Sequence, residues 1–474
     1  MSFFEKHITP DKLAKDSIWK LLFRFSLPAI IAMSATSLYN LTDSIFIGRG
    51  VGAMAMAGLG ITLPIMNIVS ALGSMVGIGA SALFSLLLVK NKNETEKILP
   101  NVILLNIILA FLVFSIGFFF TEPLLQLFGA SEDIIISGEI QQGSLNYAKT
   151  YLKILLFGNL ITNMYLSLNE LLRVSGYPQK SMLIMLASIS LNCVLDGWFI
   201  FGLKWGIAGS AYATLCSQLV ALLIILLHFS KKTNFIHFSK FYPLQTHIVK
   251  SILKIGTPSF LLHFCTSIVV FFINNALSPF GDLYIGTYSI INRVVMLFIM
   301  IIAGFNQGMQ PIVGYNYGAK NNQRTLKTLK LTIFCAVIVM SIGCLLAENF
   351  PQQIASLFID TQNENLAIKT QNIFFLNITV EAIRIVFIVF PLIGCQIVIS
   401  NFFQFIGKPY LSIFLTLTRQ ILFLIPLLLI LPEFFGAKGV WMSMPIADGV
   451  ASILAIIALF FFLKKTNPLK FSRF

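Results

Sequence analysis

The chain has 474 residues, of which 57% are hydrophobic and only 11% are charged, and 45 of them are phenylalanines. A soluble domain has too little interior to hide that much apolar surface, so the composition excludes a soluble globular protein. The formal net charge of +14 would suit a nucleic-acid binder, but most of the 33 lysines and arginines lie in short polar segments between apolar runs. We therefore expect a protein of the lipid bilayer that binds no nucleic acid.

Apolar segments long enough to cross a bilayer as helices, about 20 residues each, recur along the whole chain. The first begins near residue 20 and has no small-residue cleavage pattern, which favours an uncleaved first span over a secretory signal. An all-α polytopic membrane protein is therefore predicted. Its twelve expected spans are residues 20–47, 53–89, 95–120, 145–172, 180–203, 206–230, 247–278, 283–318, 322–348, 370–406, 410–431 and 437–463.

Basic residues fall mainly on one side of these spans. If the N-terminus is cytoplasmic, that side receives Lys6–Arg24, Lys231–Lys254 and Lys320–Lys330, whereas acids such as Glu122 and Glu433 fall on the other side. An excess of lysine and arginine marks the cytoplasmic side. We expect a multi-pass protein of the bacterial plasma (inner) membrane with both termini in the cytoplasm.

The two halves of the sequence match each other at a displacement of about 230 residues. The matching features are Pro28 with Pro258, Gly79 with Gly308, Gly206 with Gly436, and Gly176-Tyr-Pro178 with Gly407-Lys-Pro409. Six spans per half leave the two copies in the same orientation, which predicts two six-helix bundles related by a pseudo-twofold axis along the membrane normal. The predicted domains are an N-terminal bundle at 1–230, a cytoplasmic linker at 231–246 and a C-terminal bundle at 247–474. This architecture is typical of a secondary transporter, and we expect a monomer.

Two acids lie deep within predicted spans of the first half. A charge there costs roughly 2.5–3.5 kcal/mol, so each acid needs a partner or a function. Asp43 follows Arg24 by nineteen residues, or about 28 Å of helix, and Asp196 follows Lys180 by sixteen, or about 24 Å. Both acids are therefore expected at a similar depth toward the outer leaflet.

An amide and a hydroxyl accompany these acids. Asn192 lies one helical turn before Asp196 on the same face, and Thr214 lies early enough in the next span to reach the same depth. Carboxylate, amide and hydroxyl oxygens are ligands for a small hard cation, and two carboxylates can instead share a proton. Binding of Na⁺ or H⁺ is thus predicted at Asp43, Asn192, Asp196 and Thr214. Alternatively, each acid only hydrogen-bonds a neighbouring helix or faces water near the interface.

Other polar residues inside the spans are weaker candidates. We expect i,i+3 ion pairs for Glu170 with Arg173 and for Glu381 with Arg384. Asp448 either lines a cavity or pairs with a local helix partner. Arg293 and Arg419 either contact substrate in a cavity or form structural pairs with other groups of the protein. The predicted cavity or substrate contacts are Tyr39, Asn163, Asn169, Arg293, Gln307, Gln310 and Arg419.

Signatures of other chemistry are missing from the sequence. It contains no phosphate-binding GxxxxGK[ST] motif and no GxSxG nucleophile motif, and its six cysteines and five histidines show no metal-ligand spacing. We expect no enzyme and no cofactor apart from Na⁺ or H⁺ as a coupling ion.

Three groups of residues carry a family resemblance. They are Pro28, Tyr39 and Asp43 in the first span, the two Gly-x-Pro turns, and the run Gln310-Pro-Ile-Val-Gly-Tyr-Asn-Tyr-Gly318. Together they resemble the multidrug and toxic compound extrusion (MATE) transporters over essentially the whole chain, and the DinF-like branch in particular. This resemblance implies a coupling-cation site at Asp43, Asn192, Asp196 and Thr214, with Tyr39 beside it and a helix bend at Pro28. The NorM-like branch uses acids on spans seven and ten, where this sequence has only Glu381.

The resemblance implies an antiporter that exports small organic, cationic, drug-like compounds in exchange for sodium ions or protons. One alternative is a flippase for lipid-linked saccharides, for which Arg293 and Arg419 argue; another is a membrane-embedded channel or enzyme. Only the N-terminal copy carries the cation ligands. At a displacement of 230, the four site residues correspond to Ile273, Leu422, Pro426 and Met444.

Overall fold

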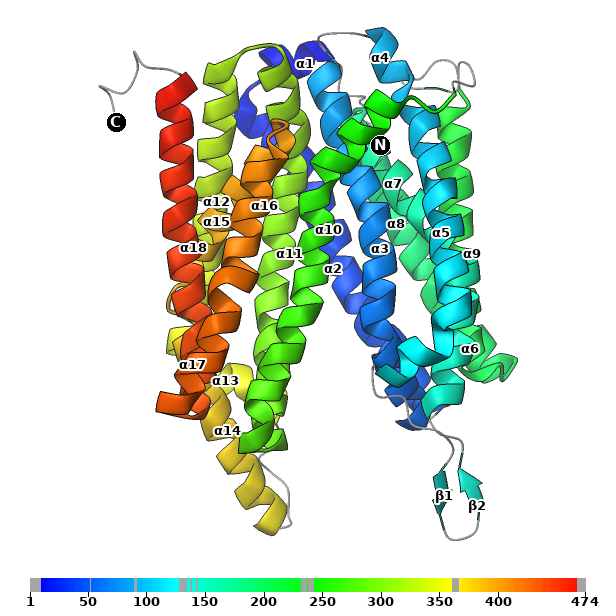
Figure 1. Cartoon of the computed structure of the whole chain (residues 1–474), viewed down its shortest axis with the longest axis vertical. Helices are drawn as coiled ribbons and strands as arrows, with labels where there is room; N and C mark the ends of the chain where they lie inside the picture. The colour runs from blue at the N-terminus through cyan, green and yellow to red at the C-terminus, as the bar shows by residue number, and fades with distance from the viewer. Residues whose placement is uncertain are drawn as a thin grey trace.

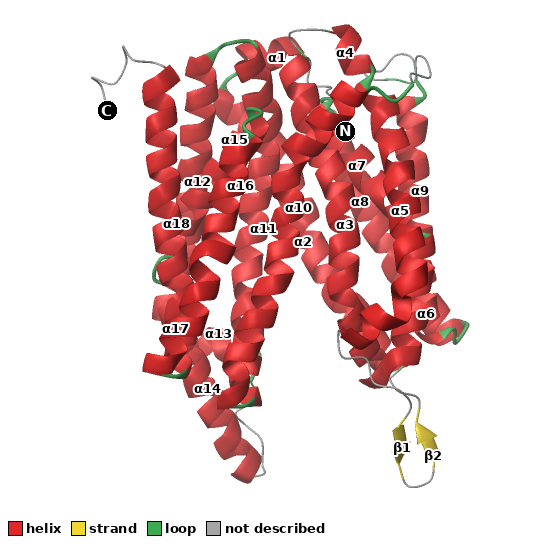
Figure 2. Ribbon diagram, in the orientation of Figure 1, coloured by secondary structure: helices red, strands yellow, loops and turns green. Residues whose placement is uncertain are grey.

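The computed structural model describes residues 10–51, 53–88, 92–127, 134–136, 139–141, 144–231, 237, 243–359 and 366–466, and long helices dominate it (Figures 1 and 2). The helices of the first half are α1 (Pro10–Lys15), α2 (Ile18–Gly50), α3 (Ala53–Leu87), α4 (Lys92–Glu96), α5 (Ile98–Leu127), α6 (Ser144–Phe157), α7 (Asn159–Val174), α8 (Pro178–Gly197), the π-helical turn η1 (Trp198–Gly202) and α9 (Gly206–Phe229).

The second half contains α10 (Thr246–Leu277), η2 (Ser278–Phe280), α11 (Asp282–Gly318), α12 (Asn322–Asn349), α13 (Pro351–Ser356), α14 (Leu366–Phe387), α15 (Phe390–Phe405), α16 (Pro409–Leu417), the π-helical segment η3 (Thr418–Leu424), α17 (Ile425–Phe435) and α18 (Ala437–Thr466). Most of the expected linker at 231–246 lies outside the described residues.

The expected spans correspond to these helices, and the all-α fold class is confirmed. Among the described residues, ten helical segments are long and apolar enough to cross a membrane, and the bent pair of α14 and α15 supplies an eleventh. The remaining expected span, 145–172, is formed by α6 and α7; the buried polar residues of α7 make it less apolar than the others. A short antiparallel hairpin of β1 (Ile134–Ile136) and β2 (Glu139–Gln141) was not anticipated.

Prolines account for two interruptions within expected spans. The span predicted at 370–406 is broken by 51° between α14 and α15. Pro391 lies in the first turn of α15, where its missing N–H is tolerated but the preceding helix cannot continue. In α5 the backbone is non-helical at Phe120, three residues before Pro123. By contrast, α2 is one continuous helix through Pro28.

The repeat seen in the sequence recurs in the backbone of its turns. Gly176 and Gly407 both adopt positive φ, at 101° and 76°, and each is followed by a proline in the first turn of the next helix. Gly206 and Gly436 both have φ of 59°. Left-handed backbone favours glycine because it has no Cβ, so these matched glycines serve the same local geometry in both halves.

The two halves form side-by-side bundles that meet at the end carrying α1 and α4 and diverge toward the end carrying β1 and β2 (Figure 1). At the end where the halves meet, called the closed end below, α2 packs on α11 and α3 packs on α10. Ser26 of α2 lies against Gly308 of α11, and Gly256 of α10 lies against Gly79 of α3, so closely that an added Cβ on these glycines would collide. Gly308 corresponds to Gly79 in the repeat, and Gly256 corresponds to Ser26 at a displacement of 230, so the closed end consists of two equivalent helix crossings.

Candidate functional site

Three helices of the first half meet, and each of them carries a pair of polar residues four positions apart. That spacing places both members on one helix face, one turn apart. The pairs are Tyr39 and Asp43 on α2, Asn192 and Asp196 on α8, and Ser210 and Thr214 on α9. The helices therefore bring the four predicted cation ligands together.

Asp43 is held by α9. Its side chain is 8% exposed, and its Oδ1 accepts a hydrogen bond from Ser210 Oγ at 2.7 Å. Tyr39, one turn earlier, lies 3.4 Å from Thr214 through their hydroxyl oxygens. The C-terminal half of α2 is thus joined to α9 by two side-chain contacts.

Asp196 is fully buried on α8. With its amide nitrogen facing Asp196, Asn192 donates to Asp196 Oδ2 at 2.8 Å and accepts from the backbone N–H of Thr214 at 3.0 Å. Asp196 Oδ1 is buried and has no hydrogen-bond partner among the described residues. The π-helical turn η1 begins two residues after Asp196, and such local departures from α-helix frequently mark functional positions.

The surroundings of the two acids are apolar. Ile47 and Ile200 lie one turn beyond Asp43 and Asp196, and they pack with Ile207 and Ala211 in one buried cluster. Neither acid takes part in an ion pair among the described residues. Since two unpaired carboxylates are costly to bury, a proton or a bound cation is the simplest way to neutralise the site.

Sequence reasoning missed two residues of this site. Ser210 lies one turn before Thr214, and that i,i+4 spacing could have found it. Tyr151 of α6 is 6% exposed and packs in the same buried cluster as Ile47 and Ile200, which lie one turn beyond the two acids. No spacing in the sequence relates Tyr151 to either acid.

The other candidates of the first half lie on α7. Asn163 is 1% exposed, and both its amide atoms lack a hydrogen-bond partner in the described part of the chain. The side-chain oxygen of Asn169 accepts from Ser181 Oγ at 3.0 Å. Asn163 therefore keeps its hydrogen-bonding capacity, whereas Asn169 uses part of its own within the bundle.

Two glutamines predicted as cavity residues lie where the halves meet. Gln307 of α11 accepts from Arg173 Nη1 at 2.5 Å, and Gln310 Nε2 donates to the Ile78 carbonyl of α3 at 3.3 Å. Arg173 also forms the expected ion pair with Glu170. Arg173 is only 4% exposed and connects the two halves through Gln307.

In the second half, the Arg419 guanidinium of η3 pairs with Asp448 of α18 through Nε and Oδ1 at 2.6 Å. Arg293 of α11 is exposed, and no described residue forms an ion pair with it. The pair predicted between Glu381 and Arg384 is wrong, because Glu381 instead contacts Lys438 at 2.5 Å. The beginning of α18 brings Lys438 to Glu381, which spacing along α14 cannot reveal.

Comparison with known proteins identifies the family. A family model described as MatE matches residues 28–198 and 258–430, which together exceed half of the chain, and the two matched segments begin at Pro28 and Pro258. The chain belongs to the MatE family. This MATE protein is 26% identical over 448 residues to the multidrug export protein MepA of Staphylococcus saprophyticus, with 94% of each chain covered.

Solved structures agree with this membership. A MATE protein crystallised in the bent conformation is 26% identical, with a TM-score of 0.87 over 98% of this chain and 99% of its own. An outward-facing multidrug resistance MATE transporter is also 26% identical, with a TM-score of 0.86 over 98% of this chain and 100% of its own. The chain is therefore a membrane transporter of the multidrug export type, and the expectation that it is not an enzyme is confirmed.

Proposed function

We propose that this MATE transporter exports organic, cationic, drug-like compounds in exchange for Na⁺ or H⁺ bound between Asp43 and Asp196. The observation that carries the proposal is the convergence of two buried carboxylates without a cationic partner among the described residues. Hydroxyl oxygens of Tyr39 and Thr214 lie beside them and add to an oxygen donor set suited to a small hard cation, while Asn192 holds Asp196 Oδ2 through its amide nitrogen.

Helix α2 offers a route from ion binding to movement of the halves. Its outer part carries Asp43, while its inner part carries Ser26 and Ile30, which pack against Gly308 and Gly304 of α11 in the other half. A cation that draws Asp43 toward α8 and α9 would shift α2 and so change its packing on α11. Such coupling requires only that the ion bind the two conformations with unequal affinity.

The direction of export follows from the predicted orientation. If the basic end with α1 and α4 faces the cytoplasm, the halves diverge toward the outside, and the described conformation is outward-facing. Binding of the coupling ion from the outside would then favour release of the substrate, after which the transporter returns to the inward-facing conformation.

The test is efflux of a cationic dye from proteoliposomes under separate sodium and proton gradients. Asp43→Asn and Asp196→Asn should abolish gradient-driven transport while leaving the amount of inserted protein unchanged. Glu348→Gln makes the same chemical change at the far end of α12 and should transport normally. Undiminished transport by both aspartate variants would disprove the ion site, and transport that requires ATP would disprove the class of mechanism.

A further inference from the structure

We propose that a basic cavity between the start of α2 and the start of α12 binds the headgroup of an anionic phospholipid. The cavity has a volume of about 720 Å³ and lies at the closed end of the molecule. It is separate from the site at Asp43 and Asp196, and the proposal does not depend on the identity of the coupling ion.

The charge of the cavity suits a phosphate. Lys15, Arg324, Lys327 and Lys330 line it, with Asp16 as the one acid among its lining residues. Lysine ammonium groups and arginine guanidinium groups bind phosphate oxygens by charge-assisted hydrogen bonds, and basic pockets between transmembrane helices bind anionic lipid headgroups. The excess of positive charge therefore favours an anionic ligand over a zwitterionic one.

Arg324 is positioned as the fixed part of this cavity. Its Nη2 donates to the backbone carbonyls of Leu13 at 3.1 Å and Asp16 at 2.6 Å, which orients the guanidinium. Its Nε is buried and has no hydrogen-bond partner among the described residues. The exposed side chains of Lys15 and Lys327 can adjust around a phosphate that Arg324 helps to place.

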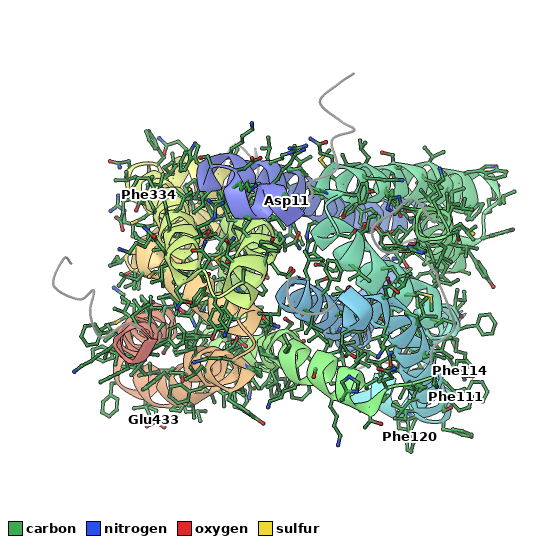
Figure 3. All side chains as sticks on the ribbon, turned by 90° about the horizontal axis from the view of Figure 1, so that it is seen from above. Asp11, Phe111, Phe114, Phe120, Phe334 and Glu433 are labelled. Atoms are coloured by element: carbon green, nitrogen blue, oxygen red, sulfur yellow. The ribbon has the colours of Figure 1, made fainter. Side chains whose placement is uncertain are left out.

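An apolar stripe leads from the cavity along the membrane-facing side of α2. Trp19 lines the cavity, and Phe23, Leu27 and Ile31 follow at intervals of four residues; all four are between 39% and 54% exposed. On α12, Phe334 and Ile338 are exposed and follow Lys330 at intervals of four residues on the same helix face. Figure 3 shows Phe334 along the same long side of the molecule as Asp11 of α1. A basic cavity that continues into apolar stripes matches a phospholipid with its acyl chains, whereas a soluble phosphate would use only the cavity.

The cavity is built from both halves of the transporter. Lys15 and Trp19 belong to the first half, and Lys327 and Lys330 belong to the second. A lipid bound there contacts both halves at the end where they meet, so its binding energy stabilises the conformation in which this end is closed.

The test measures lipid retention by native mass spectrometry on the purified full chain. The double variant Lys15→Gln/Lys327→Gln is compared with Lys250→Gln/Lys464→Gln, which removes two exposed lysines from other helices at the same end. Wild-type protein should retain phosphatidylglycerol in preference to phosphatidylcholine. The cavity variant should lose phosphatidylglycerol affinity at least about tenfold, and the control variant should not.

Three results would overturn the proposal. The first is equal retention of both lipids, and the second is an equal loss of phosphatidylglycerol affinity in both double variants. The third is stabilisation of the folded protein by inorganic pyrophosphate without retention of phosphatidylglycerol. The last result would assign the cavity to a soluble phosphate. Gel filtration and circular dichroism establish that each variant is folded. A second measurement on the unmodified chain, release of phosphatidylglycerol at high salt, checks the electrostatic origin without any substitution.

Discussion

Ser210 of α9 donates a hydrogen bond to Asp43 of α2 across 2.7 Å, and the two residues are 167 positions apart in the sequence. This bond occupies one carboxylate oxygen of Asp43 and fixes the direction of the other. Ser210 therefore positions a proposed cation ligand.

Substitution of Ser210 should weaken ion coupling without abolishing it. A hydrogen bond to a charged group contributes about 1.5–3 kcal/mol, so Ser210→Ala should raise the half-maximal cation concentration for dye efflux roughly tenfold or more. Ser217→Ala is the matched control, since Ser217 is also buried on α9 but donates only to the Thr214 carbonyl. Equal effects of the two substitutions would argue against a positioning role for Ser210.

The proposed site also predicts a thermal-stability effect. A ligand that binds only the folded state stabilises it by about 2.7 kcal/mol at a hundredfold excess over Kd, so the saturating coupling ion should raise the Tm of the wild-type protein. Sodium salts should do so if Na⁺ couples transport, and choline salts at equal ionic strength should not. Asp43→Asn and Asp196→Asn should lose the effect, and Glu348→Gln should keep it. A sodium-dependent rise in Tm that survives in both aspartate variants would place the ion elsewhere.

Glycine at the closed end should be required for close approach of the halves. Gly308→Leu forces side-chain atoms against Ser26 of α2 and should cost about 1–3 kcal/mol, lowering Tm and slowing transport. Gly60→Leu on α3 is the control, because an added Cβ there has no neighbour within 4 Å. Both variants are compared by thermal unfolding and by dye efflux, and a neutral Gly308→Leu would contradict the close packing.

The ion pair in the second half predicts that the effects of single substitutions on the free energy of unfolding are strongly non-additive. Arg419 and Asp448 have side-chain exposures of 19% and 13%, so Asp448→Leu leaves a mostly buried guanidinium unpaired and should destabilise the protein by about 3 kcal/mol. The double variant Arg419→Met/Asp448→Leu should recover most of that loss. A double-mutant cycle on unfolding measures the coupling, and additive effects would show that the pair contributes little.

Apolar length and buried charge were the informative features of the sequence. The expected span 322–348 corresponds closely to α12 (Asn322–Asn349), because the bilayer sets the length of a spanning helix independently of its neighbours. Asp43 and Asp196 stood out because charge is rare in such segments. Tyr151 and the partner of Glu381 were missed since both depend on which helices adjoin, and helical periodicity describes only one helix at a time. The break between α14 and α15 was missed although Pro391 was visible, because membrane helices often accommodate proline.

The two equivalent helix crossings at the closed end affect how tightly transport can be coupled. Gly79 faces the backbone of α10, and Gly308 faces the backbone of α2, so backbone meets backbone at each crossing with no room for a further side chain. If the halves move as rigid bodies that share both crossings, parting one crossing strains the other, and the two must separate together. An all-or-none separation leaves little time in a half-parted state, which is the state through which ions would leak and dissipate the gradient without exporting anything.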